Sequence, residues 1–332
     1  MDTSGLLIVL AAGTLGSATL LPMKFVKNWP WENTWLIFAL FAYLIFPLAV
    51  ALITIPGLTQ LYREAGWGTI LLVSLFGLGW GLSLILLGLS VAAVGLAVTN
   101  GIILGCSIAI GSLVPLLMID ASSLFTPAGV RILLADGLIL AGVAVCARAG
   151  YLRDRGEAHE VHLGKAALWG VFLCFIAGLL TPLFNLAFSF GSELIELARQ
   201  NGAKEEFAVN GVWGLACSIG SLPSIVYCAT LLRKNSTWTT YRFPGSGWNV
   251  ALCVLMGALF IIATVGYGMG ALRMGPLGPV IGWPVYISSL IIGNCFWGWL
   301  TGEWQNAPTK LIGLMIVGIF LQVAGIVVLS LA

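Results

Sequence analysis

The sequence predicts an all-α integral membrane protein with ten transmembrane helices in a five-plus-five inverted repeat. Ten apolar runs, each about the length that a helix needs to cross a bilayer, occupy most of the 332-residue chain. Only 8% of the residues are charged and 59% are apolar, whereas about 25% of the residues of a soluble domain are charged. The runs divide into two groups of five, and this odd number predicts that the halves are inverted.

The predicted helices follow the apolar runs in chain order, and their bounds are placed by reading hydropathy against glycine, proline and charge breaks. A closed β-barrel is excluded because its strands are short alternating segments, whereas 311–331 is one long apolar run. The predicted spans are 5–22, 34–55, 68–88, 96–118, 129–147, 165–188, 208–230, 249–270, 279–300 and 310–330.

The start of the chain and its cysteines add two expectations. Asp2 stands where a signal peptide has a basic region, so we expect the first span to remain in the mature protein. The seven cysteines lie inside predicted spans without zinc-binding or redox spacing, and we expect them to pack as small apolar residues. The net charge is only +2, and no basic face predicts a nucleic-acid partner.

Orientation follows from the lysines and arginines of the short connections. The odd-numbered connections hold ten, namely Lys24, Lys27, Arg148, Arg153, Arg155, Lys165, Arg233, Lys234, Arg242 and Lys310. The opposite side holds five, namely Arg63, Arg131, Arg199, Lys204 and Arg273. The bias predicts cytoplasmic odd-numbered connections and places both chain ends outside.

The predicted domains are a first five-helix repeat at 1–150, a cytoplasmic basic linker at 151–164 and a second repeat at 165–332. Weak self-similarity supports the repeat, because Ser107–Ser112 resembles Ser289–Asn294. Small residues four apart, such as Gly77 and Gly81, predict closely packed helices.

Enzymatic activity is not expected. Both histidines, His159 and His162, lie in the charged linker rather than in a span. The sequence contains no phosphate-binding loop, nucleophile elbow or zinc-protease motif. We therefore predict no catalytic residue, no metal site and no cofactor.

Uncharged polar and aromatic side chains inside the spans form the predicted substrate site. Amides and hydroxyls bind sugar hydroxyls, while aromatic rings pack against the C–H surface of a sugar. Hydrogen bonds that only join helices are the alternative for any one of these residues. The predicted substrate-binding residues are Trp80, Asn100, Ser107, Thr181, Asn185, Tyr267, Trp283, Tyr286, Ser289 and Asn294.

Three charged residues are candidates for coupling or gating. Asp136 lies more than one turn inside a span, which by default indicates a proton carrier; the alternative is pairing with Arg131 or reaching the interface. Lys24 and Glu32 flank the start of the second span and form a candidate gating pair. A purely interfacial anchor is the alternative for Glu32, which favourably meets a helix N-terminus.

Several motifs resemble, in order along the chain, those of the L-rhamnose–proton symporter family of the drug/metabolite transporter superfamily. They are Pro22-Met-Lys24, Trp29-x-Trp31-Glu32, Trp35, Phe76-Gly-x-x-Trp80-Gly81, Ala147-Arg148-Ala149-Gly150 and Glu303-Trp304-Gln305-Asn306-Ala307. The segment 82–89 is more apolar here than in the rhamnose carriers.

The resemblance implies a multi-pass protein of the bacterial inner membrane that imports L-rhamnose or a related sugar with a proton or another cation, by alternating access. It also implies a central cavity lined by spans one, three, four, six, eight and nine. Besides the bilayer, the expected partners are the sugar and the cation. The alternatives are a uniporter or exporter of another small neutral metabolite, and a membrane sensor or assembly subunit without transport activity.

Overall fold

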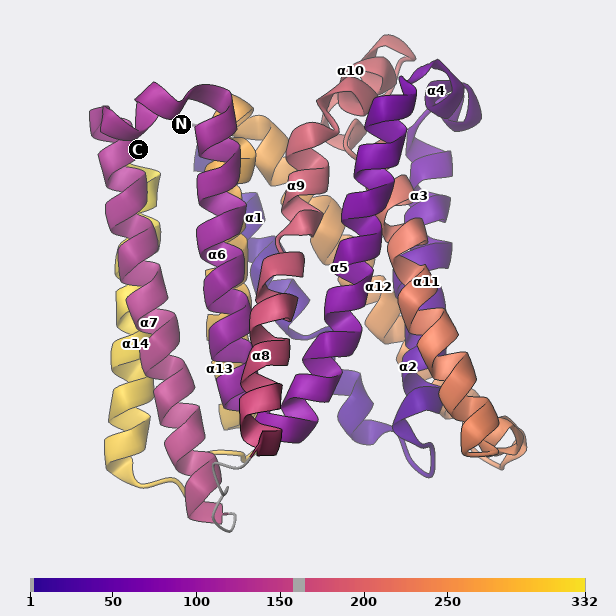
Figure 1. Ribbon diagram of the computed structural model, residues 1–332, viewed down its shortest axis with the longest axis vertical. Coiled ribbons are helices and arrows are strands. Elements are labelled where there is room, and N and C mark those ends of the chain that lie inside the picture. Colours follow the sequence, from indigo (N-terminus) through magenta and orange to yellow (C-terminus); the bar gives the residue numbers. More distant parts are fainter. Residues whose placement is uncertain (1–2, 158–164, 332) are drawn as a thin grey trace.

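The computed structural model describes residues 3–157 and 165–331, and within these ranges it is a bundle of helices without strands (Figure 1). Ten helical segments of the described chain are long and apolar enough to cross a membrane. The predicted all-helical membrane class is therefore confirmed. The histidines of the linker lie outside the described residues.

The helices of the first half are α1 (Thr3–Ser17), η1 (Leu21–Phe25), α2 (Trp31–Ala39), the π-turn η2 (Leu40–Ile45), α3 (Phe46–Thr54), α4 (Leu58–Glu64), α5 (Trp67–Val94), α6 (Leu96–Asp120), η3 (Ala121–Phe125) and α7 (Pro127–Glu157). Glycine at position 95 has φ +83°, and this left-handed conformation lets the chain reverse between α5 and α6.

The helices of the second half are α8 (Lys165–Leu180), α9 (Leu183–Phe190), α10 (Ser192–Gln200), η4 (Glu205–Phe207), α11 (Asn210–Lys234), η5 (Thr237–Arg242), α12 (Ser246–Arg273), η6 (Gly275–Leu277), α13 (Gly278–Leu300) and α14 (Thr309–Ser330). The sixth span differs most from its predicted bounds of 165–188. It is interrupted at Thr181-Pro182 and its helical segments extend to Gln200.

The two ends of the bundle differ in what they carry. The described chain begins and ends at the end of the bundle that also carries α4 and α10 on its far side (Figure 1), and we call this the terminal end. The opposite end carries the connections 18–30, 235–245 and 301–308, and we call it the basic end because it holds the larger predicted set of lysines and arginines. The structure thus groups the connections as the orientation argument requires.

The main helix contacts join elements that are distant in the sequence. Helix α7 packs along α14 at one edge of the bundle, and α5 packs along α11 near the other (Figure 1). Helix α1 packs against α12 and α13, while α8 packs against α5 and α6. Helices α6 and α13 contact each other between these groups.

Small residues allow the close approach of α5 and α11. A Cβ atom on Gly81 would lie 1.9 Å from the carbonyl oxygen of Gly220, and one on Gly77 would lie 2.2 Å from that of Ala216. No side chain fits at these distances, so the predicted close packing at both glycines is confirmed. The seven cysteines lie in helices and are all free thiols.

Candidate functional site

The interruption of the sixth span positions one of the predicted site residues. Helix α8 ends at Leu180, and the chain resumes helical structure as α9 after Thr181 and Pro182. The Thr181 hydroxyl donates to the Ala177 carbonyl at 2.8 Å, while Pro182 has no N–H group to continue the helix. The break places Asn185 in the first turn of α9, in the middle of the bundle.

Asn185 is fully buried and joins three other elements through its amide. Its Nδ2 donates to the carbonyls of Gly111 on α6, at 2.8 Å, and Pro279 on α13, at 3.0 Å. Its Oδ1 accepts a hydrogen bond from the hydroxyl of Tyr267 on α12. A buried amide that lost these partners would be left with a large desolvation penalty, so the contacts hold four elements in register.

Helix α13 adds two aromatic residues beside Asn185. Trp283 Nε1 donates to the carbonyl of Ser107 at 3.0 Å and contacts its hydroxyl at 3.3 Å. The ring of Tyr286 lies 5.1 Å from that of Tyr267 and 5.9 Å from that of Trp283, centroid to centroid. We call Ser107, Asn185, Tyr267, Trp283 and Tyr286 the central polar layer; all five are buried.

Trp80 and Ser289 flank this layer without a hydrogen bond to it. The Trp80 ring packs against Phe184, at 4.7 Å between centroids, and against Tyr43, at 5.2 Å. The Ser289 hydroxyl donates to the carbonyl of Val285 in its own helix, at 2.8 Å. The Ser289 bond stays within α13 and the Trp80 contacts are ring packing, so neither matches the helix-joining hydrogen bonds that were the alternative.

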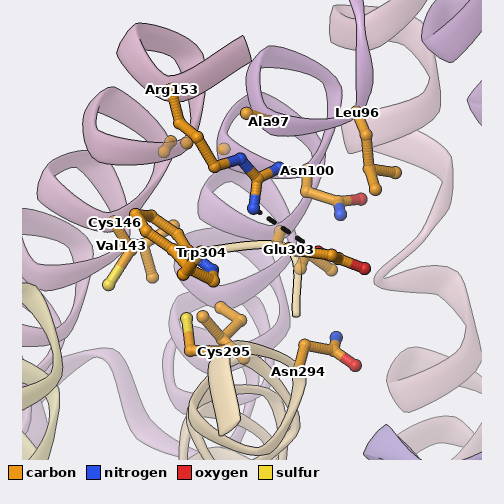
Figure 2. A pocket seen from close by; sticks show the side chains of 15 residues that line it. Leu96, Ala97, Asn100, Val143, Cys146, Arg153, Asn294, Cys295, Glu303 and Trp304 are labelled. Atoms are coloured by element: carbon orange, nitrogen blue, oxygen red, sulfur yellow. Dashed lines mark hydrogen bonds and ion pairs between the residues drawn. The ribbon is translucent and has the colours of Figure 1, made fainter. Parts of the chain in front are cut away.

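Two cavities lie on opposite sides of the central polar layer. The terminal-end cavity has a volume of about 310 Å³ and is lined by Pro115, Met118, Ser189, Phe190, Ser192, Pro276 and Pro279. The basic-end cavity has a volume of about 130 Å³ (Figure 2) and is lined by Leu96, Ala97, Asn100, Gly101, Leu104, Val143, Cys146, Ala147, Gly150, Arg153, Ile291, Asn294, Cys295, Glu303 and Trp304.

The order of residues along α6 places the layer between the cavities. Leu104 lines the basic-end cavity, Ser107 belongs to the layer and Pro115 lines the terminal-end cavity. At 1.5 Å per residue, about 16 Å of helix separates the two cavities. Helix α13 repeats this order in the opposite direction. The resemblance implied a central cavity lined by six spans; in this conformation the rings of Tyr267, Trp283 and Tyr286 pack together in the middle of the bundle.

Asn100 and Asn294 lie in the basic-end cavity rather than in the central polar layer. Neither amide has a hydrogen-bond partner among the described residues. Figure 2 shows both side chains pointing to the same side as the carboxylate of Glu303. The two asparagines are therefore free to bind a ligand, in contrast to Asn185.

Lys24 contributes to the same end of the bundle through contacts with the turn after α13. Its ammonium group donates to Glu303 and to the Thr301 hydroxyl, the latter at 2.8 Å. Arg153 Nη1 donates to the other carboxylate oxygen of Glu303 at 3.4 Å, and its guanidinium lies 4.8 Å from the centre of the Trp304 ring. The predicted gating residue Lys24 thus pairs with Glu303 and not with Glu32.

Glu32 is buried at the first turn of α2, with its own set of partners. Its Oε1 accepts hydrogen bonds from Asn235 Nδ2 at 2.8 Å and from the Thr237 hydroxyl at 3.2 Å. Tyr241 of the same connection donates to the Asn33 carbonyl at 3.0 Å. Burial raises the pKa of the Tyr241 phenol, which keeps it a donor. Glu32 therefore anchors the connection 235–245 to α2.

Asp136 is buried in α7, and neither oxygen of its carboxylate has a hydrogen-bond partner in the described structure. Arg131, the predicted alternative partner, instead donates to the Leu331 carbonyl at 2.8 Å. The polar group beside Asp136 is the Ser112 hydroxyl, which is also unpartnered. Ser112 follows Gly111, whose carbonyl binds Asn185, so Asp136 lies one helix away from the central polar layer.

Comparison with known proteins identifies the family of this chain. The L-rhamnose-proton symport protein family matches residues 3–332. The chain belongs to this family. An L-rhamnose-proton symporter of Cronobacter sakazakii is 27% identical over 99% of this chain and 98% of its own. One of Yersinia pestis is 27% identical over 94% and 93% of the two chains.

A solved crystal structure has the same overall fold. It covers 100% of this chain and 98% of its own with a TM-score of 0.61, at 17% identity. That likeness concerns the fold alone. Family membership confirms the predicted resemblance and means that the chain is a transporter and not an enzyme.

Sequence reasoning did not include Arg153, Glu303 and Trp304 among the site residues. Glu303 and Trp304 were visible only as part of a family motif in a connection, and Arg153 only as a basic residue beyond the fifth span. Only the fold reveals these three residues, because the last turns of α7 and the turn after α13 meet at the basic-end cavity.

Proposed function

We propose that this protein imports L-rhamnose together with a proton across the bacterial inner membrane by alternating access. Membership of the L-rhamnose-proton symport protein family supports the substrate and the coupling ion. The observation that carries the mechanism is the central polar layer, which lies between one cavity at each end of the bundle. A carrier needs such a closed layer so that the substrate site opens to one face at a time.

The predicted inverted repeat fits the packing of the helices. Each span of the first half can be matched with the span five places later in the chain. The contact of α1 with α12 then corresponds to the contact of α8 with α5, and that of α1 with α13 corresponds to that of α8 with α6. The contacts of α7 with α14 and of α6 with α13 each join two matched spans. Two inverted five-helix units, at 1–150 and 165–332, account for this correspondence and supply the rocking motion that alternating access requires.

Asn185 is the proposed centre of the substrate site. Its amide is held in this closed state by carbonyls of α6 and α13 and by the Tyr267 hydroxyl. When the helices separate, the same groups become available to sugar hydroxyls, and the rings of Trp283 and Tyr286 provide surfaces for the sugar's C–H face. Trp80, Thr181 and Ser289 support this site through the contacts described above.

Asp136 is the proposed proton carrier, and Lys24 gates the basic end through Glu303. An ionised carboxylate without a partner is expensive in a low-dielectric interior, and a bound proton removes that cost. On α6, Ser112 lies beside Asp136 and the preceding residue, Gly111, binds Asn185. Protonation of Asp136 therefore changes the free energy that is needed to open the central polar layer.

Uptake of labelled L-rhamnose by proteoliposomes, with and without an imposed proton gradient, tests this function. We expect accumulation above equilibrium only when the gradient is present. Absence of L-rhamnose uptake would contradict the proposed substrate. Uptake that does not depend on the proton gradient would contradict proton coupling and indicate a uniporter.

Two asparagine variants test the proposed site. Asn249 is a matched control because it is a buried amide of α12 that donates to the Lys27 carbonyl at 2.7 Å, far from the central polar layer. Both Asn185→Ala and Asn249→Ala should lower stability by about 1–3 kcal/mol through lost buried hydrogen bonds. Only Asn185→Ala should raise the KM for L-rhamnose; equal KM values in the two variants would contradict the proposed site.

A further inference from the structure

The basic-end cavity holds three polar groups that face one side. Asn100 comes from α6, Asn294 from α13 and Glu303 from the turn that follows α13. Figure 2 shows their side chains in a column, with Glu303 between the two amides. The amides lack partners among the described residues, so each has donors and an acceptor for a ligand that carries hydroxyl groups.

Glu303 retains acceptor capacity beyond its two ion pairs. One of its oxygens is bound by Lys24 and the other by Arg153. A carboxylate has about four acceptor positions on its two oxygens, so each oxygen can still accept a hydroxyl proton. Two neighbouring acceptors of this kind match the two donors of a vicinal diol.

The charge around Glu303 selects against a cationic ligand. Two cations, Lys24 and Arg153, form ion pairs with this one carboxylate. Hydrogen bonds to a carboxylate are stronger than those to a neutral acceptor. A neutral polyol gains these bonds without adding a charge to the cavity.

The remaining wall of the cavity is apolar. Leu104, Val143 and Ile291 line it together with Trp304. Such a wall suits the C–H face and the methyl group of a deoxysugar. The volume, about 130 Å³, is below the roughly 300 Å³ at which pockets for drug-sized ligands begin, so the cavity excludes a ligand as large as a disaccharide.

We propose that the basic-end cavity is a second monosaccharide subsite, in which Glu303 accepts two vicinal hydroxyls and Asn100 and Asn294 bind the neighbouring ones. This subsite rests on the proposed function as a sugar carrier and deepens it. The sugar occupies the subsite on the basic-end side of the central polar layer, so it is bound there after the layer has opened and before release. Glu303 becomes a specificity-determining residue and is more than a structural ion pair.

Titration of the detergent-purified full chain with L-rhamnose and with its deoxy analogues, each lacking one hydroxyl of the diol, tests the proposal. Glu303→Gln should weaken binding of L-rhamnose about tenfold or more, because hydrogen bonds to charged groups contribute that much. It should weaken binding of at least one deoxy analogue far less. Glu205→Gln is the matched control, because Glu205 is an exposed carboxylate paired with Arg199 near the terminal end, and it should bind like the wild type.

A purely structural role for Glu303 predicts equal losses for the sugar and its analogues, and that result would overturn the subsite. Asn294→Ala removes an exposed side chain and is the second variant if Glu303→Gln does not elute as a single species. It should weaken L-rhamnose binding at least threefold, and unchanged affinity would contradict the subsite.

Failure of the proposed function is separable from failure of the subsite. Transport of L-rhamnose by the wild type, with unchanged binding in Glu303→Gln, overturns the subsite alone. If the wild type does not bind L-rhamnose, a thermal-shift screen of other neutral monosaccharides replaces the L-rhamnose titration. A sugar that stabilises the wild type but not Glu303→Gln supports the subsite, whereas equal shifts or a panel without any shift overturn it.

Discussion

Asp136 and Glu32 are both buried carboxylates, but they differ in their partners. Asp136 is 4% exposed and Glu32 is 7% exposed. Glu32 accepts two side-chain hydrogen bonds from the connection 235–245, whereas both oxygens of Asp136 lack a partner among the described residues. Both side chains are closed to solvent, but Glu32 lies in the first turn of α2 whereas Asp136 lies nine residues inside α7, so depth as well as hydrogen bonding separates the two groups.

The difference indicates which carboxylate can exchange a proton as part of a cycle. The partners of Glu32 stabilise its ionised form, and protonating it would weaken two contacts that hold α2 to η5. Asp136 has only the nearby Ser112 hydroxyl, which is not in hydrogen-bond geometry in this conformation. Glu32 is therefore a structural carboxylate held by donors, and Asp136, without them, is the proposed proton carrier.

The largest expected effect follows from Asp136→Asn. The amide keeps the shape of the side chain but cannot release a proton, so concentrative uptake of L-rhamnose should fall to the level of facilitated equilibration. Exchange of internal for external sugar needs no net proton movement and should change less than about threefold, which is under 1 kcal/mol. Uptake and exchange assays on the same proteoliposomes check both results; loss of both would indicate a structural defect instead.

Glu32→Ala should give the opposite pattern. Removing the carboxylate leaves Asn235 and Thr237 without their acceptor, so stability should fall by about 2 kcal/mol. The ratio of proton to sugar flux should not change. Thermal unfolding in detergent measures the first effect and paired flux assays the second. A changed flux ratio would place Glu32 in the coupling step and remove the contrast with Asp136.

Asn235→Ala tests the same anchor with a smaller change. Glu32 keeps the Thr237 hydroxyl and loses only the shorter hydrogen bond, so destabilisation should be about 1 kcal/mol. The double variant with Glu32→Ala should be less destabilised than the sum of the single variants, because they remove one shared contact. Additive unfolding energies would show that the two side chains do not interact.

Ser112→Ala should have the smallest effect. Its hydroxyl lies beside Asp136 without forming a hydrogen bond in this conformation, so stability should change by no more than about 0.5 kcal/mol. If the hydroxyl binds Asp136 in another state of the cycle, the pH at half-maximal uptake should shift in this variant. The pH profile of uptake measures that shift, and Ser224→Ala, another buried unpartnered hydroxyl on α11, is the control.

Hydropathy alone predicted the helical membrane class and all ten spans, because lipid requires long apolar helices with internally satisfied backbones. The sixth span was the least accurate, since the break at Thr181-Pro182 carries no hydropathy signal. Asn185 is a buried amide within the bundle, but its partners come from α6, α12 and α13, and no periodicity in the sequence reports such contacts.

The charged groups at the basic end show why other residues were missed. Lys24 and Glu32 are near in sequence, so they were the obvious pair, yet the fold brings Lys24 to Glu303 across the whole chain. Arg153 and Trp304 meet only because the last turns of α7 reach the turn after α13. Sequence spacing predicts neighbours on one helix, and these contacts depend on which helices pack together.

Proton movement driven by the sugar tests the central claim most directly. Proteoliposomes that contain a pH-sensitive dye and no imposed gradient are exposed to external L-rhamnose, using the wild type, Asp136→Asn and Glu32→Gln. We expect acidification of the lumen with the wild type and with Glu32→Gln, and none with Asp136→Asn although its sugar exchange persists. Acidification by Asp136→Asn at the wild-type rate would contradict the account.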